Sequence, residues 1–177
     1  PREKVLKLSD SLGISKLAAH VLVARGFDDK EEVAKFLTPS LERDAHDPYL
    51  IPGLADASQR VFEAIKNNER IAIFGDFDVD GLSATAVLTQ ALRELGVSDV
   101  KAYIPKRFDE GYGLSQLALK RVLEDAQPQL LITVDTGIAA DQAVAWLLEH
   151  DVDVVVTDHH EPSDSIPKHV PVVNPKL

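Results

Sequence analysis

From residue 55 onwards, two patterns of apolar and polar positions alternate along the chain. Short runs rich in β-branched residues are typical of buried strands, and the segments between them repeat apolar residues at helical spacing. Strands are expected at residues 71–74, 100–104, 130–134 and 152–156, with a short apolar run at 170–173. Helices are expected at residues 55–67, from about 82 to 95, 115–125 and 139–150. Because strands alternate with helices, the sequence predicts an α/β fold with a parallel sheet of about five strands and helices on both faces.

The first 53 residues follow a different pattern. Short helices are expected around residues 5–8, at 16–24 after Ser15 as N-cap, and at 28–37, where the acidic start suits a helix N-terminus. Residues 38–53 include Pro39, Pro48, Pro52 and Gly53, which predicts an irregular connector. The predicted organisation is a small helical segment with its connector, residues 1–53, before an α/β catalytic domain, residues 54–177, truncated at its C-terminal end.

Three aspartates directly follow the first predicted strand. Asp76, Asp78 and Asp80 stand at alternate positions between that strand and the next helix. Carboxylates this close repel one another unless a cation neutralises them, and a divalent ion with oxygen ligands is the natural partner. A calcium loop of the EF-hand type is disfavoured, because Val87 stands where its bidentate Glu belongs and a strand precedes the loop. A solvated acidic turn, the remaining alternative, explains poorly why all three follow a buried strand.

Polar residues follow the other predicted strands as well: Lys106 and Arg107 the second, Asp135 the third, and Asp158, His159 and His160 the fourth. Ligands bind at the carboxyl ends of the strands in such sheets, so we expect one site there. Its carboxylates and imidazoles, without sulfur, favour Mn²⁺ or Mg²⁺ over zinc, and the number of carboxylates favours two ions. Because two metal ions about 3.5 to 4 Å apart serve displacement at phosphorus, the sequence predicts metal-assisted hydrolysis of a phosphoester or phosphoanhydride.

The loop after the second predicted strand is a candidate for substrate binding. Lys106 and Arg107 lie beside the expected metals, and a planar guanidinium matches phosphate geometry. The alternative for Arg107 is a surface ion pair with Asp109 or Glu110. Tyr112 stands between two glycines and is a candidate stacking platform for a base, although an ordinary loop explains it equally well.

Composition and missing motifs exclude other classes of protein. The chain has no Cys, which excludes disulfides, thiolate metal sites and a cysteine nucleophile and favours an intracellular location. No apolar run approaches the length of about 18 residues that a membrane-spanning helix needs, so no membrane partner is expected. The sequence lacks a P-loop, a dinucleotide-binding glycine motif and a Gly-x-Ser-x-Gly elbow, so nucleotide-triphosphate motors, dinucleotide oxidoreductases and serine hydrolases are disfavoured.

The net charge of −10 bears on the kind of partner. It argues against a surface that coats nucleic acid, since Lys and Arg make phosphate contacts. Part of the acidity is the expected metal site, however, and bound cations return positive charge there. The charge therefore weakens a nucleic-acid interpretation without removing it. The lack of Met and of any stop signal at the end leads us to expect a piece of a longer protein.

Taken together, the motifs resemble the DHH phosphoesterase superfamily and, within it, the RecJ single-stranded-DNA exonucleases. The resemblance is carried by GDFDVDGLSA (75–84), YIPKR (103–107) with EGYGL (110–114), TVDTG (133–137) and TDHH (157–160). The EGYGL segment, VNPK (173–176) and LTPS (37–40) are similar to RecJ in particular. The resemblance therefore covers nearly the whole chain.

The resemblance implies 5′-to-3′ degradation of single-stranded DNA to mononucleotides, dependent on Mn²⁺ or Mg²⁺, in recombination and repair in the cytoplasm. Partners such as a single-stranded-DNA-binding protein or a helicase are implied by the resemblance alone. It also implies that Asp135 bridges both ions, that Asp158 orients its neighbours and that His160 faces the scissile phosphate. The metal ligands carried over by motif are Asp78, Asp80, Asp135 and His159, with Asp76 as a further candidate. Because the family has another aspartate ligand and a second domain downstream, the chain alone is expected to be incomplete.

Two other functions remain open. One is a small-molecule phosphohydrolase of the same superfamily, acting on pyrophosphate, polyphosphate, a cyclic dinucleotide or a short oligonucleotide. The other is a non-catalytic replication module that keeps the fold but has lost ligands. Five intact residues speak against it: Asp78, Asp80, Asp135, His159 and His160. Release of mononucleotides from labelled single strands separates the exonuclease from the small-molecule phosphohydrolase.

Overall fold

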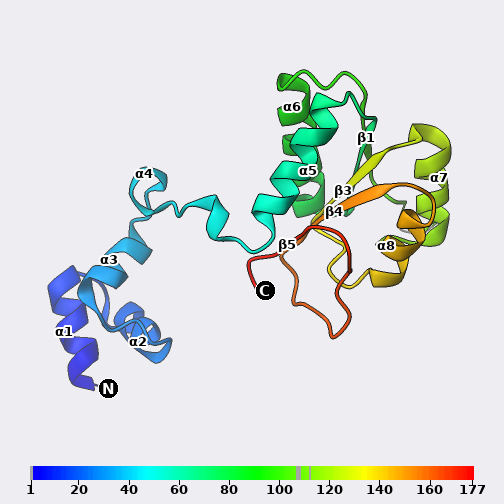
Figure 1. The fold of residues 1–177 in the computed structure, drawn as a ribbon. Helices are drawn as coiled ribbons and strands as arrows, with labels where there is room; N and C mark the ends of the chain where they lie inside the picture. The colour runs from blue at the N-terminus through cyan, green and yellow to red at the C-terminus, as the bar shows by residue number, and fades with distance from the viewer. Residues whose placement is uncertain (1, 107–108, 112) are drawn as a thin grey trace. The chain divides into compact units, whose positions relative to one another are not determined.

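The computed structural model describes residues 2–106, 109–111 and 113–177 (Figure 1). The chain forms two compact units, Pro1–Asp47 and Pro48–Leu177. The division after residue 53, which the sequence suggested, remains a prediction. Among the described residues, no helix is both long enough and apolar enough to cross a membrane.

The first unit contains the helices α1 (Arg2–Leu12), α2 (Lys16–Ala24), α3 (Lys30–Leu37) and α4 (Leu41–Asp44). The hydroxyl of Ser15 accepts the N–H of Ala18 at 3.1 Å, so α2 begins where the sequence predicted. Asp29 caps α3 by accepting the N–H groups of Glu31 and Glu32, which starts this helix later than residue 28. The core of the unit consists of Val5, Leu8, Ala19, Leu22 and Val33.

The segment expected to be an irregular connector holds two short helical turns, which corrects that expectation. α4 follows Ser40, whose hydroxyl accepts the N–H of Arg43 at 3.4 Å. The 3₁₀ turn η1 spans Pro48–Leu50. The prolines do not prevent these turns, because Pro39 precedes α4 and Pro48 is the first residue of η1, where the missing N–H needs no partner.

The second unit contains the predicted parallel sheet, and the α/β fold class is confirmed. The strands β1 (Ile71–Gly75), β2 (Val100–Tyr103), β3 (Leu130–Val134), β4 (Asp153–Thr157) and β5 (Val172–Val173) lie in the order β2-β1-β3-β4-β5. Every neighbouring pair is parallel. The chain leaves β1 for its neighbour on one side and returns to β3 on the other. The strand order therefore reverses at the carboxyl ends of β1 and β3, where ligands bind in such sheets.

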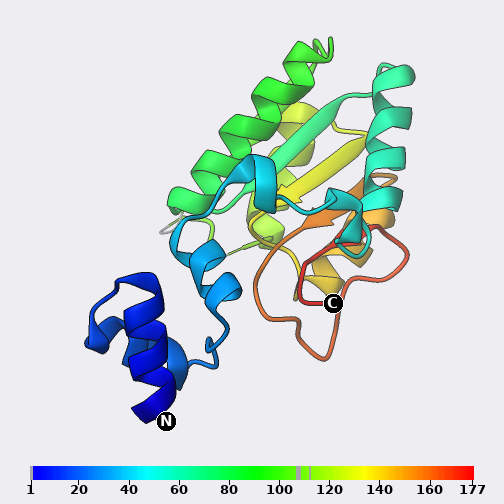
Figure 2. The same cartoon turned by 90° about the vertical axis from the view of Figure 1, so that its left-hand side faces the viewer.

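Helices cover both faces of this sheet, as predicted (Figures 1 and 2). α5 (Leu54–Lys66) and α6 (Val79–Glu94) pack on one face, and α7 (Gln116–Ala126) and α8 (Asp141–Leu148) pack on the other. Side chains alternate along a strand, so Ile71 and Ile73 of β1 pack with α5 and α6, whereas Ala72 and Phe74 pack with α7 and α8. All residues of β1 and β3 are buried, which gives the loops after them a rigid base.

The start of α6 differs from the prediction. The helix begins at Val79 instead of residue 82, because the carboxylate of Asp78 accepts the N–H of Gly81 at 3.0 Å and acts as the N-cap. Asp78 was interpreted only as a ligand, whereas it also starts the helix. A side chain at position 81 would collide with the backbone of Asp76, so the turn requires Gly81. Asp80 consequently lies in the first turn of α6.

Candidate metal centre

Asp135 follows β3 in a conformation that few residues adopt. Its φ is 61°, in the left-handed region that Asp and Asn tolerate better than most residues. Its side chain is 4% exposed, and neither carboxylate oxygen has a hydrogen-bond partner among the described residues. Burial, and then the negative charge of Asp78, raises the pKa of Asp135. An ionised carboxylate buried in this way is costly unless a cation compensates it.

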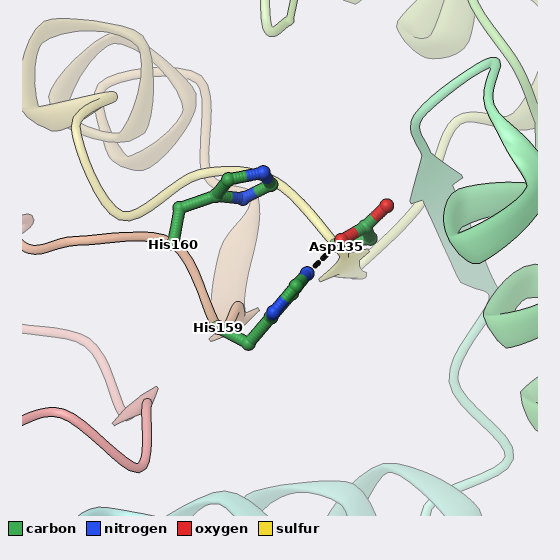
Figure 3. Close-up of side chains that lie close together, drawn as sticks. All are labelled: Asp135, His159 and His160. Carbon is green, nitrogen blue, oxygen red and sulfur yellow. Dashed lines mark ion pairs between the residues drawn. The ribbon is translucent and has the colours of Figure 1, made fainter. Parts of the chain in front are cut away.

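His159 approaches this carboxylate from the loop after β4. Its Nε2 lies 2.8 Å from Oδ1 of Asp135. The dashed line in Figure 3 marks this pair. The distance is that of an ion pair when His159 is protonated, but the contact does not have the geometry of a hydrogen bond. An imidazole nitrogen and a carboxylate oxygen therefore lie close together without forming a hydrogen bond. Two ligands of one cation are arranged in this way.

Asp135 belongs to two groups of side chains that can each hold a metal ion. Within each group the ligand atoms lie within 4.8 Å of one another. The first group is Asp135, His159 and His160, and the second is Asp76, Asp78 and Asp135. The two groups share Asp135 at the point where the strand order reverses. The buried oxygens without partners, surrounded by further carboxylates, fit a pair of divalent cations bridged by one carboxylate.

Asp158 is buried and contacts the backbone of both histidines and the ring of His160. Its Oδ1 accepts the N–H of His159 at 2.7 Å and lies 2.7 Å from Nδ1 of His160, and its Oδ2 accepts the N–H of Ile138 at 2.9 Å. Burial alone would raise the pKa of Asp158, but these donors outweigh it and lower the pKa. The bond to Asp158 raises the pKa of His160. Because Nδ1 of His160 is engaged, Nε2 is the ring nitrogen left for a ligand.

The other predicted site residues are placed as follows. Asp76 is buried and its Oδ1 accepts the N–H of Phe77 at 2.6 Å. Asp80 belongs to neither three-residue group among the described residues, but it lines a cavity of about 450 Å³ together with Asp135 and His159. Lys106 has an exposed side chain. Its backbone N–H donates to the carboxylate of Glu110 at 2.7 Å, and its carbonyl oxygen accepts the N–H groups of Asp109 and Glu110. Arg107 and Tyr112 lie outside the described residues.

Glu110 anchors the loop after β2, a role that sequence reasoning missed. Its carboxylate is buried and accepts the hydroxyl of Tyr103 at 2.6 Å, the N–H of Lys106 and a bond from Arg121. Burial acts to raise the pKa of Glu110, but these donors lower it to about 2. Burial and the bond to Glu110 raise the pKa of Tyr103 to about 12. The only signal in the sequence was an acidic residue beside a glycine, because the partners come from β2 and α7.

Asn174 is a second missed residue, and it supports the histidine loop. It is fully buried after β5. Its Nδ2 donates to the carbonyl oxygen of His160 at 2.9 Å, and its Oδ1 accepts the N–H of Lys176 at 2.8 Å. These bonds tie the end of the last strand to the histidine pair.

Comparison with known proteins identifies the family. The family model described as "DHH family, N-terminal domain" matches residues 70–177, which include every candidate metal ligand. The chain belongs to the DHH family. This confirms the resemblance drawn from the motifs.

The curated relatives of this DHH chain include single-stranded-DNA-specific exonucleases RecJ. The protein of Bacillus subtilis is 41% identical over 175 residues, which cover 99% of this chain and 22% of the relative. The protein of Haemophilus influenzae is 35% identical over 176 residues, which cover 99% of this chain and 30% of the relative. The chain therefore spans less than a third of the length of these relatives.

Solved structures show the same likeness. RecJ of Thermus thermophilus in complex with Mn²⁺ is 34% identical with a TM-score of 0.71, and the match covers 99% of this chain and 24% of that one. An exonuclease RecJ bound to manganese is 42% identical with a TM-score of 0.65, and the match covers 72% of this chain and 32% of that one. Two solved RecJ structures to which this chain is similar therefore contain manganese.

Proposed function

We propose that this chain carries the metal-binding part of a phosphodiesterase that degrades single-stranded DNA from its 5′ end to mononucleotides, with Mn²⁺ or Mg²⁺ as cofactor. The observation that carries the proposal is the buried carboxylate of Asp135, which lacks hydrogen-bond partners and is shared by two groups of ligands. The relatives named as single-stranded-DNA-specific exonucleases, and the RecJ structures that contain manganese, support the substrate and the metal.

The proposed ligands divide between two cations. Asp76 and Asp78 would hold one ion together with Asp135, and His159 would hold the other together with Asp135. Asp80 lines the same cavity, so we propose that it acts from the first turn of α6 on the first ion or on the water around it. Bound divalent cations supply neutralisation of the phosphate charge and an activated water for displacement at phosphorus.

The chain's own residues prepare this chemistry. Asp158 holds the backbone N–H groups of His159 and His160 and also the ring of His160, so the imidazole of His160 does not have to be ordered when substrate arrives. His160, whose pKa Asp158 raises, stays protonated to a higher pH than a free histidine. We propose that its Nε2–H donates to the scissile phosphate and that Lys106 and Arg107 contact the phosphates that follow.

The test is a nuclease assay with Mn²⁺ on the whole protein of which this chain is expected to be a piece. Single strands blocked at the 5′ end should resist degradation, strands blocked at the 3′ end should be degraded, and mononucleotides should be released. Hydrolysis of pyrophosphate or polyphosphate without attack on DNA would instead establish the small-molecule phosphohydrolase. Tight metal binding without any hydrolysis would establish the non-catalytic module.

A further inference from the structure

A second cavity, of about 550 Å³, lies beside the metal groups. We call it the α7–α8 pocket. Its walls are the segment 113–116 that leads into α7, the pair Thr136 and Gly137 after β3, and the first turn of α8, with Trp146 and Leu119 behind them. Asp135 does not line it, but Thr136 is the next residue, so the pocket and the metal groups include neighbouring residues of the chain. The pocket opens on the α7 and α8 side of the same sheet edge.

The side chain of Thr136 shows that the pocket is open to a polar ligand. Thr136 is only 8% exposed, and its hydroxyl makes no hydrogen bond within the described part of the chain. The hydroxyl lies beside Gly113, where a Cβ would be 3.8 Å from Oγ1. By contrast, the hydroxyl of Thr133 donates to the carbonyl oxygen of Thr136 at 2.7 Å. Oγ1 of Thr136 is not among the buried side-chain atoms that lack a partner, so it is accessible from the pocket, where a ligand can form a hydrogen bond with it.

The polar groups around the pocket are held in place before any ligand binds. The hydroxyl of Ser115 donates to the carbonyl oxygen of Glu110, and its N–H donates to that of Gly113 at 2.9 Å. On the opposite wall, the hydroxyl of Ser165 donates to Oδ2 of Asp141 at 2.7 Å. The pocket is therefore built by contacts that do not depend on the metal ligands.

The chemistry of the lining selects the ligand. Leu119 and Trp146 give an apolar floor, and His150 packs against the ring of Trp146 with 4.0 Å between centroids. The polar groups are hydroxyls, the amides of Gln116 and Gln142, and one carboxylate. Among the described lining residues there is no Lys or Arg, so the pocket does not select a phosphate. A flat ring with hydrogen-bonding edges, such as a nucleobase, matches an aromatic floor with amides at its rim.

We infer that the α7–α8 pocket binds the nucleobase of a nucleotide whose phosphate lies at the metal groups. The inference rests on the proposed function for the position of the phosphate, but base binding itself needs no metal. The nucleobase stacks over the apolar floor and accepts a hydrogen bond from Thr136, and its N–H groups donate to the carboxylate of Asp141. The protein thus binds the base of the nucleotide in addition to its phosphate.

The chain offers a direct probe, because Trp146 is its only tryptophan and gives a single indole N–H signal in a nitrogen–proton correlation spectrum. Thymidine and deoxyadenosine, which carry no phosphate, are titrated into the 177-residue chain in EDTA. We expect the Trp146 signal to shift with dissociation constants of about 0.1 to 1 mM, as the usual efficiency of small ligands implies. Inorganic phosphate should leave the signal unchanged.

Two variants and one matched control test the location. Ala143→Leu fills the pocket and should weaken nucleoside binding by about tenfold or more, whereas Ala145→Leu changes an exposed residue of the same helix outside the pocket and should not. Thr136→Val removes only the hydroxyl and should weaken binding about three- to tenfold.

The outcomes separate this inference from the proposed function. Nucleoside binding that Ala143→Leu abolishes supports the pocket even if the whole protein proves to have no exonuclease activity. Three results overturn the inference even if the exonuclease assay succeeds. The Trp146 signal does not shift at about 10 mM nucleoside, ten times the weakest expected dissociation constant; it shifts with phosphate alone; or Ala143→Leu and Ala145→Leu have equal effects.

Discussion

Replacing Asp135 by Asn should make the metal-free protein more stable while it removes metal binding. Asn tolerates a φ of 61° as Asp does, so the change removes the charge without adding backbone strain. Asp135 and Asp78 have ligand atoms within 4.8 Å, and two unit charges at that distance repel by about 3 kcal/mol at an effective dielectric constant of about 20. Because Asp78 is exposed and His159 offsets part of the charge, we expect a gain of about 1 to 2 kcal/mol in the free energy of unfolding.

Urea unfolding of the 177-residue chain in EDTA at neutral pH measures this gain. Asp151→Asn is the matched control, because Asp151 also has a positive φ, 57°, but is exposed and lies outside the site. The control should change stability by less than about 0.5 kcal/mol. Added Mn²⁺ should stabilise the wild-type chain, by the linkage between binding and folding, and should leave the Asn variant unchanged.

The pH dependence gives the same experiment a second readout. The pKa of Asp135 is raised in the folded state, so its unfavourable contribution is present above that pKa and disappears as pH falls through it. The wild-type chain and the Asn variant should therefore converge in acid. A variant that is less stable than wild type in EDTA at neutral pH would refute the reasoning, because the carboxylate would then have a compensating partner without metal.

Three further predictions concern neighbouring residues. Glu110→Gln should lower the free energy of unfolding by about 1 to 3 kcal/mol at pH 7. Because the pKa of Glu110 is lowered from 4.5 to about 2, the carboxylate stabilises the fold above pH 4.5 and this stabilisation is lost towards pH 2. A difference in stability between wild type and variant that stays constant from pH 4.5 to pH 2 would contradict this prediction. Asp158→Asn should lower the pKa of His160 towards its ordinary value in an NMR titration, whereas an unchanged pKa would show that Asp158 does not orient that ring. Arg107→Ala should weaken binding of single-stranded DNA to the whole protein and flatten the salt slope by about one unit, and an unchanged slope would favour the surface ion pair.

The strands could be predicted from the sequence because buried parallel strands are continuous apolar runs with distinct ends. β3 lies at residues 130–134 as expected, and the bounds of β1, β2 and β4 differ from the predicted ones by one residue at most, whereas β5 begins two residues later than the predicted run at 170–173. The polar residues after each strand could be placed on one edge without knowing the strand order. The start of α6 could not be predicted, because Asp78 both caps the helix and offers a metal ligand. A pattern of apolar residues indicates neither role.

Contacts between elements that are distant in sequence were beyond the reach of the pattern. Glu110 depends on Arg121 of α7 and on Tyr103 of β2, so its burial appears only when these elements pack. Trp146 and Leu119 repeat at helical spacing with core residues, and helical spacing does not distinguish a core position from the floor of a pocket. Asp80 matched the motif but lies on the first turn of α6, apart from both groups of metal ligands.

A calorimetric titration of the 177-residue chain with Mn²⁺ tests the central claim most directly. We expect the chain to fold, to bind two ions weakly and to show little or no processive nuclease activity. We expect Asp135→Asn to abolish metal binding at both sites, because both groups of ligands share that carboxylate. The same titration on Asp151→Asn should reproduce the wild-type result. Binding of a single ion that Asp135→Asn leaves intact would contradict a metal centre bridged by Asp135.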